Sequence, residues 1–298
     1  MLRSSQIGVA VLATLMMASV PGLAQSRQSS PEGDGATRDF GFFSRFRPKS
    51  TAKPRTKPVY RRKGAALDAT KVVPDAAIGL TLWKARPATR RDPAADRDIV
   101  QKSDGTTTQL VLSRAGGDAE LEIGQDFRIG IESPRAGFLY VINRSIRADG
   151  SAGAPYLIFP TARIHGGNNR VRGGQVVMLP TPPAEQPFTI SDSSGDLASE
   201  EVIVIVSNER LDVETRDERY ELSKELVDGW MSRWTAPVET FEMEGGADAP
   251  YTAAETAAAT KPGRLLNASE PAPQLIQRVA AKPGDPLLVR MQIRVRRE

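Results

Sequence analysis

Two apolar runs constrain the fold of this chain more than any other feature. Residues 138–142 (FLYVI) and 202–206 (VIVIV) are each about as long as one strand, and both are rich in β-branched and aromatic residues. Turn-forming residues bound the first run, with Pro134 and Gly137 before it and an Asp-Gly pair after it. Because apolar side chains occupy both faces of each run, we expect two strands in the middle of a sheet that is covered on both sides.

The segment 78–208 contains further short apolar runs that are separated by Gly- and Pro-rich turns. Residues 127–132 (FRIGIE) alternate most cleanly and put Phe127, Ile129 and Ile131 on one face. No helical periodicity separates the runs, which argues against βαβ units. The pattern therefore predicts a mainly β domain, an antiparallel β-sandwich of Ig-like or related type. The expected strands are 79–84, 109–112, 127–132, 138–143, 156–159, 175–179, 188–190 and 202–206.

Several of these pieces follow one another in an ordered set. They are GLTLW at 79–83, FRI at 127–129, GFLYV at 137–141, IFP at 158–160, NRV at 169–171, LP at 179–180 and EVIVIVS at 201–207. In this order they resemble the bacterial family called domain of unknown function 4384, over roughly residues 79–208. The resemblance implies a β-rich accessory module of exported or envelope-linked proteins, and it supplies no catalytic residues.

The N-terminal residues predict a targeting segment. Arg3 precedes a mostly apolar stretch at 7–20, and Gly22 and Ala24 place small residues at positions −3 and −1 of a cleavage site. A membrane anchor is the alternative, but the stretch is shorter than the roughly 20 residues that span a bilayer. We therefore expect residues 1–24 to be a signal peptide and the mature protein to be exported to the periplasm, the cell envelope or the medium.

Residues 25–77 are expected to form a disordered, basic, proline-rich arm, because like charges and prolines keep such a segment extended. The sequence pI of about 9.4 raises nucleic acid as a partner. Export disfavours that partner and favours an anionic membrane or wall surface. The equal alternative is a solubilising tether, or an arm that folds back on the acidic region at 200–228. The cations expected to contact such a surface are Arg45, Arg47, Lys49, Lys53, Arg55, Lys57, Arg61, Arg62 and Lys63.

An amphipathic helix is expected within residues 209–236. Thr215 and Glu218 fit a capping box at its start, and Pro237 follows its end. Packing on the sandwich is the favoured interpretation of its apolar face, and docking on a partner is the alternative. The residues of that face are Leu222, Leu226, Val227, Trp230, Met231 and Trp234.

Two different segments follow the helix. Residues 237–284 are expected to be a largely disordered linker, because Ala, Thr, Pro and Gly dominate most of it. Residues 285–298 alternate between apolar and mostly basic positions, which predicts a half-buried strand at a sheet edge. Whether this strand pairs within its own chain is left open. Its apolar positions are Val289, Met291, Ile293 and Val295.

Recognisable catalytic or metal-binding signatures are missing from the sequence. The chain has no cysteine, which excludes disulfides and thiol chemistry. His165 is its single histidine, a poor basis for a catalytic triad or a zinc site. Residues 192–196 (DSSGD) lack the further acids and the final glutamate of a calcium loop. We predict no catalytic residue, no cofactor and no metal ion.

Together these features predict an exported, non-enzymatic binding or accessory module of the bacterial cell envelope that recognises a protein or an envelope polymer. Two alternatives stay open. The first is a hydrolase of envelope polymers whose two carboxylates converge at about 5–10 Å. The second is a structural assembly partner that pairs strands through its C-terminal edge. The ligand and the oligomeric state do not follow from the sequence.

Overall fold

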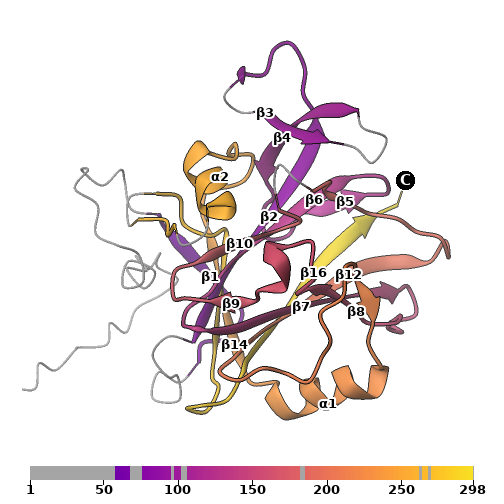
Figure 1. Cartoon of the computed structure of the whole chain (residues 1–298), viewed down its shortest axis with the longest axis vertical. Helices are drawn as coiled ribbons and strands as arrows, with labels where there is room; N and C mark the ends of the chain where they lie inside the picture. Colours follow the sequence, from indigo (N-terminus) through magenta and orange to yellow (C-terminus); the bar gives the residue numbers. More distant parts are fainter. Residues whose placement is uncertain are drawn as a thin grey trace, which may run out of the picture. The chain divides into compact units, whose positions relative to one another are not determined.

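The computed structural model describes residues 58–67, 76–94, 97–101, 106–181, 185–261, 264–267 and 270–297. Over these residues the chain is mainly β, with two sheets, which we call sheet A and sheet B, and two α-helices (Figure 1). All named strand pairs but one are antiparallel. The sandwich-like arrangement confirms the predicted fold class. The predicted signal peptide lies outside the described residues.

Sheet B has two long strands at its centre. β7 (Gly137–Arg147) pairs antiparallel with β12 (Leu197–Ser207), and Val141 lies opposite Val204. The two apolar runs are therefore neighbours in the middle of one sheet, as predicted. The other strands are β5 Glu120–Glu122, β8 Tyr156–Phe159, β9 Arg170–Val171, β13 Tyr220–Glu221 and β16 Leu287–Arg296. The strand order is β13, β8, β7, β12, β16, β5, and β9 also pairs with β7.

Sheet A is built around β2 (Ala77–Pro87). This strand pairs antiparallel with β6 (Asp126–Glu132), with β4 (Thr107–Arg114) and with β15 (Leu275–Val279). The other strands are β1 Tyr60–Lys63, β3 Arg97–Gln101, β10 Val176–Leu179, β11 Phe188–Thr189 and β14 Val238–Met243. The order is β1, β14, β15, β2, β4, β3, and β10 and β11 both pair with β6.

The core between the sheets is apolar. Val202 and Val204 of β12 pack in one cluster with Ile129 and Ile131 of β6, and all four side chains are at most 1% exposed. Burying one such side chain contributes about 1.5–3 kcal/mol relative to leaving it exposed. These contacts hold the two sheets together, and they confirm the predicted core face of residues 127–132.

Helix α1 (Lys224–Trp234) covers the outer face of sheet B. Ile203 and Ile205 alternate with the inward valines of β12, so they point away from sheet A and pack with Val227 and Trp230 of the helix. This second cover explains why β12 is apolar on both faces. It also confirms the favoured interpretation that the helix packs on the sandwich.

The predicted start of this helix is wrong. Ser223, not Thr215, is the N-cap, and its hydroxyl accepts a hydrogen bond from the backbone N–H of Leu226 at 3.2 Å. The preceding segment is held in non-helical form by sheet B. The N–H of Ala162 donates to the carbonyl of Arg216 at 2.7 Å, and strand β13 follows. The capping pattern at residue 215 was therefore a chance match.

The linker expected at residues 237–284 contains regular structure where the chain is described. Strands β14 and β15 pair with each other, and α2 (Ala253–Thr260) lies between them in the sequence. Thr252 and Glu255 form the capping box that starts α2. Ala259 packs on sheet A in a cluster with Trp83. Of the helices in the described ranges, none is long and apolar enough to cross a membrane.

The predicted disordered arm is also too long. Residues Tyr60–Lys63 form β1, which pairs antiparallel with β14. Tyr60 is 1% exposed, packs with Phe241 and Ile276, and donates its hydroxyl proton to the carbonyl of Pro273 at 2.6 Å. One buried aromatic side chain therefore fixes this end of the basic segment to sheet A.

The C-terminal strand pairs within its own chain. β16 lies beside β12, with Leu287 opposite Val206 and Arg294 opposite Ser199. Its last three residues also pair with β5 in parallel. The alternation of core and outward side chains along β16 is as predicted. However, β5 pairs with the edge of β16 that faces away from β12. The predicted edge position is therefore wrong over Arg294–Arg296.

Candidate functional site

A cavity of about 330 Å³ lies between the two sheets. Its walls come from β6 and β11 of sheet A, from β7, β8 and β12 of sheet B, and from the segment before β13. Thr189 and Arg219 are exposed, so the cavity reaches the surface. We call it the inter-sheet cavity. The residues that line it are Phe127, Ile129, Asn143, Ile158, Pro187, Phe188, Thr189, Ile190, Ser191, Glu200, Val202 and Arg219.

The inner wall of the inter-sheet cavity is apolar. Ile129, Ile158 and Val202 belong to the main core and are at most 5% exposed. Phe127 and Phe188 lie directly opposite each other on β6 and β11, with ring centroids 5.6 Å apart. Phe188 is only half-buried. This wall therefore offers an aliphatic and aromatic surface to whatever enters.

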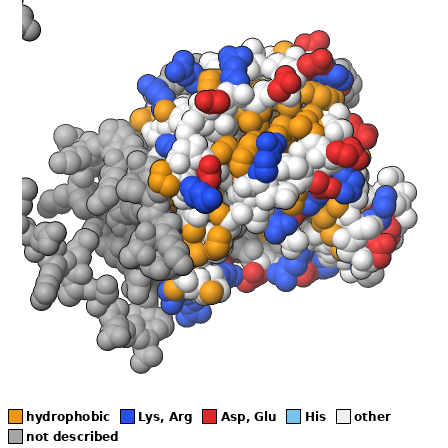
Figure 2. Space-filling view, turned by 90° about the horizontal axis from the view of Figure 1, so that it is seen from below, with side chains coloured by type: hydrophobic (Ala, Val, Ile, Leu, Met, Phe, Trp, Pro, Cys, Tyr) orange, Lys and Arg blue, Asp and Glu red, His pale blue; other side chains and the backbone are white. Residues whose placement is uncertain are grey.

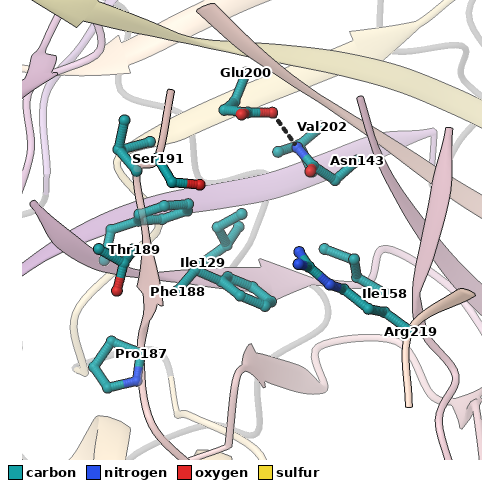
Figure 3. Close-up of a pocket in the computed structure, with 12 residues that line it drawn as sticks. Ile129, Asn143, Ile158, Pro187, Phe188, Thr189, Ser191, Glu200, Val202 and Arg219 are labelled. Carbon is teal, nitrogen blue, oxygen red and sulfur yellow. Dashed lines mark hydrogen bonds between the residues drawn. The ribbon is translucent and has the colours of Figure 1, made fainter. Parts of the chain in front are cut away.

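A carboxylate faces this apolar wall from sheet B. Glu200 lies on the same face of β12 as the inward-facing Val202 and Val204, so its side chain points between the sheets. One carboxylate oxygen accepts a hydrogen bond from Asn143 Nδ2 at 2.9 Å, and the other accepts one from Ser145 Oγ at 3.0 Å. These two donors fix the orientation of the half-buried carboxylate, and Figure 3 shows the bond from Asn143.

A guanidinium group approaches the cavity from another side. Arg219 directs its guanidinium toward the middle of the inter-sheet cavity, across from Glu200 (Figure 3). Its guanidinium carbon lies 5.8 Å from the centre of the Tyr156 ring. The cavity thus combines an apolar wall, one oriented carboxylate and one exposed cation.

A second cavity of about 290 Å³ adjoins the first and shares Asn143 and Ser191 with it. The loop that begins at Asp192 forms part of its wall. Burial acts to raise the pKa of Asp192. Hydrogen bonds from the N–H groups of Leu197 and Gly195 outweigh burial, so the pKa of Asp192 is lowered. The loop therefore uses this carboxylate to hold its own turn. In the described part of the chain, no group of three or more acidic or histidine side chains could hold a metal ion.

The predicted surface cations divide into two groups. Those from Arg45 to Lys57 lie outside the described residues. The last three lie on β1 and pair with acids: Arg61 with Glu244, Arg62 with Glu239, and Lys63 with both Asp118 and Glu242. These three are therefore engaged by acids at and near β14 and by Asp118.

The predicted partner-facing helix residues do not form a free surface. Leu222, Val227 and Trp230 are at most 6% exposed and lie against sheet B. These three side chains are therefore packed on the sheet and are not free to face a partner. Leu226, Met231 and Trp234 are half-buried at the margin of the same cluster. Figure 2 views the molecule from below, the side on which Figure 1 places α1, and shows hydrophobic patches interrupted by charged side chains.

Sequence reasoning predicted several of these residues as strand or core residues but did not identify the cavity as a site. The only signal was the polar side chains of Asn143, Ser145 and Glu200, which occur within or beside the apolar runs of β7 and β12. None of the predicted site residues lines the inter-sheet cavity. His165, in the short turn η4 (His165–Gly167), does not line it either.

The fold and the cavity define a β-sandwich domain with a ligand-sized space between its sheets. Residues 120–210 match the family described as Domain of unknown function (DUF4384), a range that runs from β5 to just beyond β12. The match confirms the resemblance over that range and does not include β2. No curated protein and no solved structure matches the chain. Every residue that lines the cavity except Arg219 belongs to the matched range.

Proposed function

We propose that the protein is a non-enzymatic binding module that takes part of a protein or envelope polymer into the inter-sheet cavity. The observation that carries the proposal is the cavity itself. Its volume of about 330 Å³ falls in the range of roughly 300–1,000 Å³ that is usual for ligand sites. An apolar wall with a few oriented polar groups is also the usual composition of such sites.

The composition of the cavity supports binding over hydrolysis. Glu200 is the single carboxylate among the residues that line it. The hydrolase alternative needs two carboxyl groups about 5–10 Å apart in one concave site. Glu200 also has both of its oxygens engaged by Asn143 and Ser145. This arrangement suits a fixed recognition group.

The basic arm extends the proposal to an anionic surface. Export is suggested by the N-terminal sequence, and the arm cations from Arg45 to Lys57 would then meet anionic lipid or wall material, at about 1 kcal/mol for each near-surface cation. Arg61, Arg62 and Lys63 contribute less to this contact, because their charges are already paired on sheet A. The arm contact should weaken as the salt concentration rises.

Co-sedimentation with an envelope fraction tests the cavity and the arm separately. Thr189→Trp places a large side chain at the exposed rim of the cavity, and Ser232→Trp is its control on the exposed face of α1. We expect Thr189→Trp to reduce retention and Ser232→Trp to leave it unchanged. Equal retention of the two variants would refute the role of the cavity.

The arm is tested in the same assay by deleting residues 38–57, which leaves β1 intact. Retention at low salt should fall, and the remaining retention should lose most of its salt dependence. A deletion variant that keeps the salt dependence of the wild type would show that the arm has no such role.

A further inference from the structure

The inter-sheet cavity contains a negative charge without a cationic partner among the described residues. The two hydrogen bonds that the Glu200 carboxylate accepts come from neutral groups, the Asn143 amide and the Ser145 hydroxyl. No described Lys or Arg nitrogen lies within the 4.0 Å limit of an ion pair with it. A carboxylate has about four acceptor positions, so capacity remains for a further donor. A half-buried charge of this kind favours a cationic donor from a ligand.

The same cavity contains a positive charge that is also unmatched within the described part of the chain. Arg219 contacts the Tyr156 ring, but no described carboxylate lies within 4.0 Å of its guanidinium nitrogens. Glu200 and Arg219 therefore do not pair with each other. Figure 3 shows them on different sides of the cavity, with Ile129 and Phe188 nearby. The cavity thus has a negative end, an apolar middle and a positive end.

Only a ligand with two opposite charges matches this arrangement. A purely apolar ligand would remove water from both charged groups without replacing it. A simple cation would meet repulsion from Arg219, and a simple anion would meet repulsion from Glu200. A compact ammonium group suits a carboxylate that already accepts two bonds, and the planar guanidinium suits a carboxylate. A chain of methylene groups between them would pack on Phe188 and Ile129.

We propose that the inter-sheet cavity binds a dipolar ligand, in which an ammonium group and a carboxylate group are joined by a short aliphatic stem. In a protein partner this chemistry occurs at a C-terminal lysine. The ammonium group pairs with Glu200, the terminal carboxylate pairs with Arg219, and the stem lies on the apolar wall. This inference rests on the proposed binding function and names the group that the cavity recognises.

The test measures binding of a short peptide with a free C-terminal lysine to the full chain by isothermal titration calorimetry. Three comparison ligands are the same peptide with a C-terminal amide, the same peptide ending in norleucine, and 6-aminohexanoate. Removing either charge should weaken binding by about tenfold or more, as expected for one charge-assisted hydrogen bond. The small dipolar compound should displace the peptide.

Matched variants assign each charge to its residue. Arg219→Gln should bind the acid and the amide peptides equally, and Glu200→Gln should bind the lysine and the norleucine peptides equally. Glu209→Gln and Arg216→Gln remove exposed charges outside the cavity and should bind like the wild type. Arg219 is exposed, so its variant should fold whatever happens to Glu200→Gln. The inference is overturned if the wild type does not discriminate among the peptides, or if the variants keep that discrimination.

Failure of this inference can be told apart from failure of the proposed function. If Thr189→Trp reduces envelope retention but lysine termini have no effect, the cavity binds another chemistry and only the dipolar ligand is refuted. If Thr189→Trp retains the full affinity of the wild type for the envelope fraction, the binding function of the cavity is itself refuted.

Discussion

Replacing Trp230 by alanine tests whether α1 is part of the domain's own core. The side chain is 4% exposed and lies in one cluster with Ile203, Ile205 and Leu288 of sheet B. Its ring also stacks on that of Trp234 at a centroid distance of 5.9 Å. Removing it would therefore expose apolar surface of both the helix and the sheet.

The expected cost of Trp230→Ala follows from these contacts. Substitution of a buried aromatic residue by alanine costs about 3–5 kcal/mol. Because α1 lies on the outside of sheet B, water can enter the space that the indole leaves, and we expect the lower end, about 3 kcal/mol. That loss is a large part of the roughly 5–15 kcal/mol by which domains are usually stable.

Urea unfolding of the full-length variant measures this cost, with the midpoint shifted and the m-value unchanged. Ser232→Ala, on the exposed face of the same helix, is the control and should change stability by less than about 0.5 kcal/mol. A loss below about 1 kcal/mol for Trp230→Ala would contradict the packing described for α1.

Three further predictions concern buried charge and the C-terminal strand. Arg128 is 0% exposed and donates to the carbonyls of Pro180 and Glu185, so Arg128→Met should cost about 3 kcal/mol in urea unfolding, and a loss below 1 kcal/mol would refute its role. Burial raises the pKa of Asp98, although Arg128 opposes the shift. The folded state therefore keeps the proton on the Asp98 carboxyl to a higher pH than the unfolded chain does. The stability of the wild type should fall as the pH rises from about 4, near the unfolded pKa, through the raised pKa of the folded state. Asp98→Asn should lack that fall, and parallel pH profiles of the two proteins would contradict the assignment. Deleting residues 285–298 removes β16 from between β12 and β5, so the product should lose cooperative unfolding in circular dichroism, whereas a folded product of changed size would favour an assembly role.

The centre of the fold could be predicted from the sequence because its signal is local. Residues 138–142 and 202–206 are apolar on both faces, which already indicates central strands. The strands β1, β14 and β15 could not be predicted in this way. Tyr60, Phe241 and Ile276 are buried in one cluster, although they are far apart in the chain. The other residues of these three strands are mostly charged or polar, so the sequence of each strand resembles an arm or a linker.

The inter-sheet cavity could not be predicted for a related reason. Val202 and Ile203 are both apolar, so the sequence of β12 does not show which face points to the other sheet. Without that information, Glu200 is one of many acidic residues in its region. The partners that orient it belong to β7, more than 50 residues earlier in the chain. Arg219 comes from an irregular segment whose position only the fold determines.

The place of β16 in sheet B has a consequence for synthesis of the protein. β12 is largely apolar, and one of its two neighbours is made only when the ribosome reaches Leu287–Arg296, roughly 80 residues after β12 ends. At about 5–20 residues per second, that edge of β12 stays unpaired for roughly 4–16 s. An unpaired apolar strand edge invites pairing with other chains. A nascent chain of this protein should therefore depend on chaperone protection until β16 emerges.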